Sequence, residues 1–204
     1  MITPLHFVCK YGQDITDLFD ELAALRIAVF RDFPYLYEGS LAYERAYLGT
    51  YARSDRSMLF AVYDADRMVG ATTCIPLAEE TDDVQEAFVR ANMEVSKIFY
   101  FGESVLLPPY RGQGLGHRFF DEREAHVQRL GTYDTTCFCA VDRPGDHPMR
   151  PPGYKPLDAF WAGRGYQQDA KLRSTFSWPD VGESDATPKS MLFWIKKWSL
   201  MCMV

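Results

Sequence analysis

Stretches with an apolar residue at every third or fourth position alternate along the chain with short, strongly apolar runs. The first spacing predicts amphipathic helices, because it places the apolar side chains on one helical face. The second pattern is typical of buried strands. We therefore expect helices over residues 14–33, 41–51, 81–92, 115–130 and 156–164, and strands over residues 5–9, 58–63, 68–75, 98–107, 135–141, 172–178 and 191–198.

Strands and helices alternate for most of this order, which predicts a mixed α/β fold around a central sheet. The chain has 204 residues, a length that suits one domain with a sizeable core. We expect residues 1–204 to form a single domain. Asp14 is the expected N-cap of the first helix, and Pro34 is expected to end it.

Charge and cysteine content narrow the function classes. The net charge is −6, and an acidic chain lacks the basic surface that releases counterions from nucleic acid, so we expect no nucleic-acid partner. We expect no membrane partner, since no apolar run reaches about 20 residues and the N-terminus lacks a signal-peptide pattern. Five scattered cysteines predict a reducing, cytoplasmic setting rather than a disulfide framework.

The chemistry is concentrated where an apolar strand meets a glycine-rich turn that begins a helix. The segment after the strand reads Arg111-Gly-Gln-Gly-Leu-Gly-His117. The first turn of a helix has free N–H groups and partial positive charge, and the three glycines let an anion approach the backbone closely. Arg111 adds a fixed cation. This junction predicts a cradle for phosphate or pyrophosphate.

Three phosphate-binding patterns compete for this segment. A P-loop requires a lysine after its last glycine, and His117 stands there instead. A dinucleotide fingerprint requires Gly-x-Gly-x-x-Gly, whereas the spacing here is Gly-x-Gly-x-Gly. The third pattern fits, because Arg111–Gly116 after a strand with a terminal proline resembles motif A of the GNAT acyltransferases. The later segment 156–166, with Phe160-Trp161 ahead of Gly165-Tyr166, is similar to the helix and turn that follow in that family.

The resemblance implies a single GNAT-type α/β (α+β) domain. Its central sheet would be twisted, mixed and mostly antiparallel, with about six to seven strands flanked by helices. The fourth and fifth strands would splay apart. The helix predicted at 81–92 is unusual for that fold, so we expect it to be an insertion.

The resemblance also implies acetyl-CoA as cosubstrate, with no metal, and an amine acceptor that attacks the thioester directly in a ternary complex. The only two cysteines close in sequence, Cys137 and Cys139, are too few for a metal site and are expected in the core. By position, the strand that pairs with the pantetheine amides comprises Ser104, Val105 and Leu106. The residues expected to hold the pyrophosphate are Arg111, Gly112, Gln113, Gly114, Leu115, Gly116 and His117.

The sequence departs from the family at the general acid. Many members have a tyrosine in the later helix, and the matching position is Trp161, which cannot donate an acidic proton. Tyr154 is therefore the candidate acid, with a packing role for its ring as the alternative. Glu103 is the candidate base. Its alternative role is a salt-bridged strand carboxylate, and a one-residue shift would turn it to the other face.

The candidate acceptor site comprises Arg26, Phe30, Tyr35 and Tyr37, which lie where the family builds its acceptor pocket. An aromatic rim would suit a cationic amine. We expect a small-molecule or amino-acid-like primary amine as the acceptor. Acetylation of a protein N-terminus or lysine is an alternative that predicts an open groove, and a non-catalytic acyl-CoA-binding module is another. A homodimer is left open.

Overall fold

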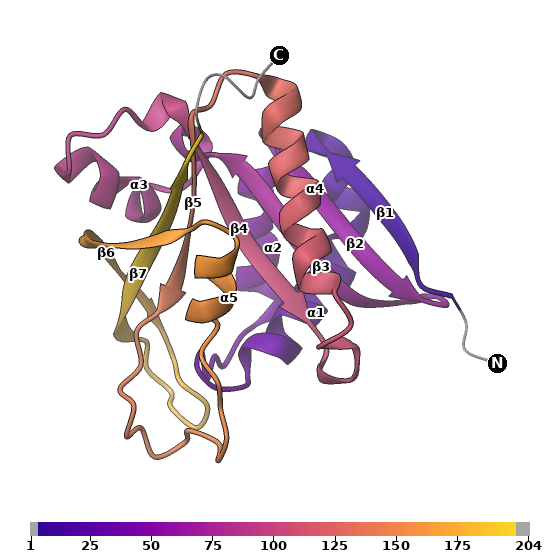
Figure 1. The fold of residues 1–204 in the computed structure, drawn as a ribbon. Coiled ribbons are helices and arrows are strands. Elements are labelled where there is room, and N and C mark those ends of the chain that lie inside the picture. The colour runs from indigo at the N-terminus through magenta and orange to yellow at the C-terminus, as the bar shows by residue number, and fades with distance from the viewer. Residues whose placement is uncertain (1–3, 199–204) are drawn as a thin grey trace.

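The apolar runs pair into one seven-stranded sheet in the order β1-β2-β3-β4-β5-β7-β6. A computed structural model describes residues 4–198 (Figure 1). The strands are β1 (His6–Tyr11), β2 (Met58–Asp64), β3 (Arg67–Pro76), β4 (Ile98–Leu106), β5 (Thr135–Val141), β6 (Gln167–Trp178) and β7 (Thr187–Lys197). All neighbours pair antiparallel except β4 and β5, which are parallel. This mixed, mostly antiparallel sheet is the predicted one.

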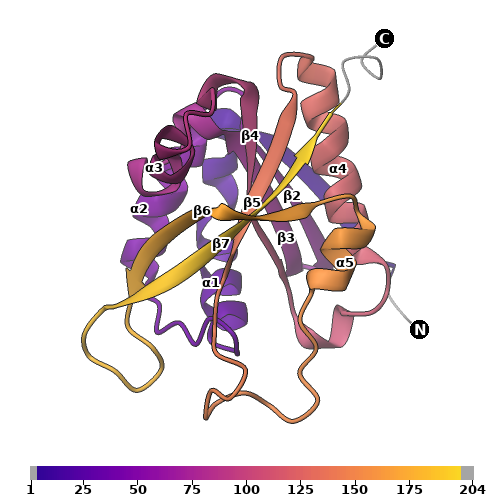
Figure 2. The ribbon, with the colours of Figure 1, turned by 60° about the vertical axis from the view of Figure 1, so that its left-hand side comes forward.

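Helices cover both faces of the sheet. One face is covered by α1 (Phe19–Phe30), α2 (Leu41–Ala52) and α3 (Asp82–Arg90), and the other by α4 (Leu115–Leu130) and α5 (Asp158–Gly163) (Figures 1 and 2). Short 3₁₀ segments connect these elements, namely η1 (Gly12–Leu18), η2 (Leu77–Glu79), η3 (Val95–Lys97) and η4 (Pro108–Tyr110). The predicted order of strands and helices is confirmed.

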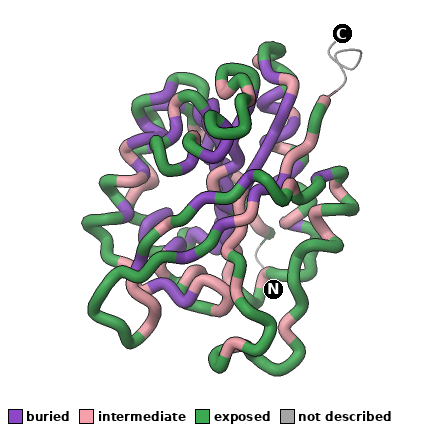
Figure 3. The backbone as a smooth tube through the Cα atoms, turned by 90° about the vertical axis from the view of Figure 1, so that its left-hand side faces the viewer, coloured by how far each residue is buried: buried purple, intermediate pink, exposed green. Residues whose placement is uncertain are grey.

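The sheet separates two apolar cores, because successive strand side chains point to opposite faces. One core lies under α1, α2 and α3 and includes Leu22, Tyr51 and Phe88. The other lies under α4 and α5 and includes Phe119 and Phe138. Buried residues accordingly follow the strands in Figure 3, whereas the loops at the lower end of the molecule are mostly exposed. In the described residues, no helix is long and apolar enough to cross a membrane.

Three elements differ from the pattern-based expectation, and one of them is β7, which begins at Thr187 rather than at residue 191. The helix predicted over residues 14–33 divides into η1 and α1, and Asp14 does not cap it. The Thr16 hydroxyl donates to the carbonyl of Gln13 at 2.8 Å, and such local bonds compete with a regular helix. Strand β6 begins at Gln167, earlier than predicted, because its first half is largely exposed and lacks the apolar signal of a buried strand.

The sheet opens between β4 and β5. Their pairing covers only Ile98–Tyr100 against 135–137. Beyond that point β5 pairs with β7 alone, and β4 pairs with β3 alone. The two strands diverge in Figure 1. This is the splay expected for the fourth and fifth strands, and we call the space between their diverging ends the notch. Helix α3 lies inside the range predicted for the inserted helix; its status as an insertion stays a prediction.

Candidate active site

The turn that joins β4 to α4 is exposed and shaped by two glycines in the left-handed region. Gly112 has φ +75° and Gly114 has φ +83°, a conformation that disfavours residues with a Cβ. Residues 111–114 are exposed. A Cβ placed on either glycine would meet no atom within 4 Å. The backbone therefore bends around open space at the beginning of α4.

The amide groups of this bend are not used within the described part of the protein. Arg118 N–H is the first amide of α4 to pair, with the carbonyl of Gly114 at 3.2 Å. The N–H groups of residues 112–117 have no protein acceptor, and no side chain caps the helix. Free donors at the positive end of a 16-residue helix are suited to an anion. The binding of a pyrophosphate at this bend stays a prediction.

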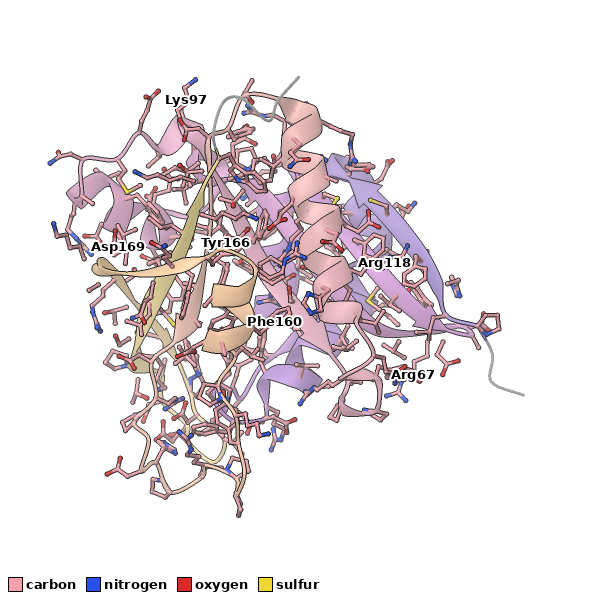
Figure 4. All side chains as sticks on the ribbon, viewed as in Figure 1. Arg67, Lys97, Arg118, Phe160, Tyr166 and Asp169 are labelled. Atoms are coloured by element: carbon pink, nitrogen blue, oxygen red, sulfur yellow. The ribbon has the colours of Figure 1, made fainter. Side chains whose placement is uncertain are left out.

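The polar side chains of the bend hold its shape. Arg111 Nε donates to the carbonyl of Leu106 at 2.9 Å, and Gln113 Nε2 donates to that of Pro109 at 2.9 Å. A second nitrogen of Arg111 lies 3.9 Å from Asp32 in an exposed ion pair, which contributes at most about 1 kcal/mol. An anion can therefore take over that contact at little cost. The ring of His117 packs against Phe160 of α5, which lies beside the first turn of α4 in Figure 4.

A β-bulge in β4 decides which way Glu103 points. Thr72 pairs with Ser104 and Cys74 pairs with Phe101, so Thr73 opposes two residues, Gly102 and Glu103. Up to Gly102 the side chains of β4 alternate between the two cores, and the extra residue then places Glu103 on the same side as Gly102. Glu103 therefore faces α1 and α2 rather than α4.

Two donors hold this bulge on the α4 side. The Thr72 hydroxyl donates to the Glu103 carbonyl at 2.6 Å, and Arg123 Nη1 donates to it at 3.4 Å. Arg123 is 2% exposed and lies over the rings of Phe101 and Phe120. Burial lowers its pKa to about 10, so the guanidinium stays charged at neutral pH.

Glu103 is buried in an acidic cluster around one cation. Arg26 of α1 bonds Glu44 through Nε and Glu103 through Nη1. Glu44 is 0% exposed and Glu103 is 5% exposed. Burial raises the pKa of Glu103, and the Arg26 guanidinium opposes that rise. A raised pKa makes this carboxylate a better proton acceptor than an exposed glutamate.

The four residues predicted for the acceptor site lie together at this cluster. Arg26 lies 5.2 Å from the ring of Phe30, and Phe30 lies 4.5 Å from the ring of Tyr35. Tyr35 and Tyr37 both pack against Trp178 of β6. The guanidinium of Arg26 is fully engaged by carboxylates, so its contact with an acceptor stays a prediction.

Two loops beside Tyr35 and Tyr37 are paired with each other. Leu36–Glu38 run beside Pro179–Val181, with Glu38 N–H donating to Pro179 at 2.9 Å and Val181 N–H to Leu36 at 2.7 Å. Arg143 joins them by donating to both carboxylate oxygens of Asp180 at 2.8 and 2.6 Å, and to the carbonyls of Pro34 and Tyr35. Backbone and side-chain hydrogen bonds therefore hold these loops together beside Tyr35 and Tyr37.

Tyr154 and Trp161 lie in different environments. Tyr154 is half-buried in the β5–α5 loop, its ring edge-on to Phe33 at 4.7 Å. Burial raises its pKa, and Arg150 over its ring opposes the rise. Trp161 packs on Phe138 and Trp194 in the α4-side core. The candidate acid Tyr154 thus lies beside the loop that follows α1 and contains Phe33 and Tyr35. Trp161 instead packs among aromatic rings of the core.

Sequence reasoning missed several polar residues of the cluster, namely Glu44, Tyr47, Tyr51, Thr73 and Glu80. A single signal could have indicated part of it. Gly102 is an isolated glycine inside an otherwise apolar strand, which is typical of a bulge or a close backbone contact. As for metals, in residues 4–198 no three His, Cys, Asp or Glu side chains are grouped so as to hold an ion.

Comparison with solved structures places this arrangement among known folds. An acyl-CoA N-acyltransferase from Pseudomonas aeruginosa aligns with 95% of this chain and 99% of its own, at 15% identity and a TM-score of 0.56. For the acetyltransferase of the GNAT family from Streptococcus pneumoniae, the shares are 95% and 100%, the identity 12% and the TM-score 0.55. The ribosomal-protein-S18-alanine N-acetyltransferase from Escherichia coli matches over 95% of both chains, at 13% identity and a TM-score of 0.54. The chain has the GNAT acetyltransferase fold.

Sequence comparison adds nothing to this assignment. No family profile and no curated protein matches the chain. At identities this low the likeness shows the fold alone. The GNAT fold is shared by enzymes with different acceptors. The chemistry must be argued from the side chains at the notch.

Proposed function

We propose that the chain is an N-acyltransferase that moves an acetyl group from acetyl-CoA to a primary amine of a small-molecule or amino-acid-like acceptor. The observation that carries this proposal is the set of free amides at residues 112–117, on an exposed helix N-terminus at the edge of the notch. A diphosphate bound there would direct the rest of acetyl-CoA along β4, where Ser104, Val105 and Leu106 have no β5 partner.

The chain's own residues support direct attack by the amine. Glu103 lies three residues beyond the last β4–β5 pair and faces the acceptor side. As a base, it would take the proton that the ammonium loses before attack. Tyr154 is the candidate acid toward the leaving thiolate. Holding both reactants in one notch is itself a large contribution to the rate.

The paired loops support a small acceptor. An internal lysine on a folded protein needs an open groove, whereas residues 36–38 and 179–181 are hydrogen-bonded across the acceptor side. The buried carboxylates Glu44 and Glu103 share a single cation, Arg26, and an excess of negative charge suits a cationic amine. Acetylation of a protein N-terminus stays the second candidate, because a free chain end is narrower than a folded surface and needs less room than an internal lysine.

Ligand-induced stabilisation tests the cosubstrate. A ligand that binds only the folded chain raises its melting temperature, with about 2.7 kcal/mol of stabilisation at 100 times Kd. We expect acetyl-CoA and CoA to raise the melting temperature, and NAD to leave it unchanged. Stabilisation by NAD with no response to CoA would contradict the proposal. Thiol release across an amine panel then separates an enzyme from an acyl-CoA-binding module.

Glu103→Gln tests the base. Loss of a general base slows turnover by about 100-fold or more, and we expect that loss in kcat with CoA binding retained. In the unmodified chain, kcat should fall as the pH drops through the raised pKa of Glu103, because the protonated carboxyl cannot accept a proton. Glu79→Gln is the control, since this carboxylate pairs with Arg56 away from the notch. Equal kcat values for both variants would remove Glu103 from the mechanism.

A further inference from the structure

A buried carboxylate behind Glu103 has no role in the chemistry proposed so far. Glu80 follows η2 and is 5% exposed. Its Oε1 accepts hydrogen bonds from the hydroxyls of Tyr47 at 3.0 Å and Tyr51 at 3.2 Å, and its Oε2 accepts one from the N–H of Thr81. Among the described ion pairs, none includes Glu80. A buried carboxylate without a cation costs stability, and its three hydrogen bonds offset only part of that cost.

The Tyr51 hydroxyl extends from Glu80 to the bulge of β4. A Cβ on Gly102 would overlap this hydroxyl, and it would come within 2.6 Å of Thr73 Oγ1. The hydroxyls of Tyr51 and Thr73 therefore lie against the same point of β4, one residue before Glu103. The absence of a side chain at Gly102 is what leaves room for them.

Thr73 connects this point with Glu103. It is the residue that opposes both Gly102 and Glu103 in the bulge. Burial raises the pKa of Glu103, whereas Arg26 and the Thr73 hydroxyl lower it. Thr73 Oγ1 and Glu103 Oε1 are both buried and have no hydrogen-bond partner in the described structure, so each atom has a hydrogen-bond position left open.

We propose that Thr73, Tyr51 and Glu80 form a proton relay that carries away the proton accepted by Glu103. The relay rests on the proposed function, in which Glu103 takes a proton from the acceptor ammonium. Arg26 cannot receive that proton, because its guanidinium is already fully protonated. A buried base that turns over repeatedly must be able to return to its ionised form, and this line of hydroxyls leads away from the notch.

The transfers balance at each atom. The Glu103 O–H bond breaks as its proton moves to Thr73 Oγ1, and Thr73 passes its own hydroxyl proton to the Tyr51 oxygen. Tyr51 in turn passes its proton to Glu80 Oε1. Both hydroxyls end with one proton each, so the net change is one proton moved from Glu103 to Glu80. Glu80 then releases it to water.

The surroundings of Glu80 allow it to take up a proton. Burial raises the pKa of Glu80, and the bonds from Thr81, Tyr47 and Tyr51 oppose that rise. A carboxylate with a raised pKa accepts a proton more readily than an exposed one. The titratable groups that face it are Tyr43, Tyr47 and Tyr51 of α2, Tyr100 and Glu103 of β4, and Cys139 of β5.

The test compares two hydroxyls on one helix. Tyr47 and Tyr51 both bond Glu80 Oε1, one helical turn apart, but the Tyr51 hydroxyl is the one that meets the bulge. With acetyl-CoA and the amine of the panel that gives the fastest thiol release, we expect Tyr51→Phe to lower kcat by about tenfold or more. Tyr47→Phe should stay within about threefold of the unmodified chain.

Two further readouts separate a relay from a packing effect. In Tyr51→Phe the solvent deuterium isotope effect on kcat should increase, because proton removal becomes rate-limiting, while the CoA-induced rise in melting temperature should persist. Glu80→Gln should also lower kcat and increase the solvent isotope effect. It replaces Tyr51→Phe in the test if that variant does not fold. Equal losses in the two Phe variants, or an unchanged isotope effect, would overturn the relay. A native chain that neither binds CoA nor releases thiol overturns the proposed function instead.

Discussion

Gly114→Glu is expected to abolish CoA binding and leave the fold intact, with Kd increased at least about 100-fold, equivalent to about 2.7 kcal/mol. The new carboxylate would project from the bend that carries the free amides, and its charge would repel a diphosphate. Calorimetric titration with CoA measures the affinity, and circular dichroism checks the fold.

Gly182→Glu is the matched control for this substitution. Gly182 has φ +88°, and a Cβ there meets nothing within 4 Å, as at Gly114. Both variants therefore add the same charge and a similar backbone strain of about 1–2 kcal/mol. Only Gly114 lies at the α4 terminus. Unchanged CoA affinity in Gly114→Glu would show that the anion site is elsewhere, whereas equal losses in both variants would indicate a general effect on the fold.

Arg26→Met should lower the free energy of unfolding by about 3–5 kcal/mol. Methionine keeps much of the volume but removes the cation that Glu44 and Glu103 share, and both carboxylates are buried. Burial alone would lower the pKa of Arg26, and the two carboxylates raise it above its ordinary value. Urea unfolding measures the loss.

Arg45→Met provides the comparison, because Arg45 pairs with Asp20 at 2.6 Å on the surface, where the two side chains are 52% and 72% exposed. We expect a change of less than about 1 kcal/mol there. The double variant Arg26→Met/Glu103→Gln should lose less stability than the two single losses added, since one buried charge is removed with its partner. Similar losses at Arg26 and Arg45 would mean that water reaches the cluster.

The sequence permitted a sound prediction of the fold and of the glycine bend at the beginning of α4, because both depend on local patterns. Apolar periodicity predicted the order of strands and helices, and the spacing of Gly112 and Gly114 predicted a backbone bend at a helix terminus. These features are set by residues close together in the chain. The splay of β4 and β5 followed from the family resemblance, since nothing in the apolar pattern distinguishes a paired strand from an unpaired one.

The acidic cluster could not be predicted in the same way. Glu44 lies in the first turn of a helix, where a carboxylate is ordinarily solvated and favourable to the helix dipole. Glu80 lies in a polar stretch with the pattern of a loop. They become buried because α1, α2 and β4 pack together, and their sequence separations of 18 and more residues leave no periodic signal. Likewise, the face of the sheet to which the Glu103 side chain points depends on the bulge in β4.

The bulge also limits how this sheet can be redesigned. Its two residues point to the same layer, so a carboxylate and a tyrosine hydroxyl can be neighbours there. Deleting Gly102 would give a regular, better-paired strand, but Glu103 would then need the volume that the Tyr51 hydroxyl fills. An engineer who straightened β4 to gain stability would have to give up one of these two groups.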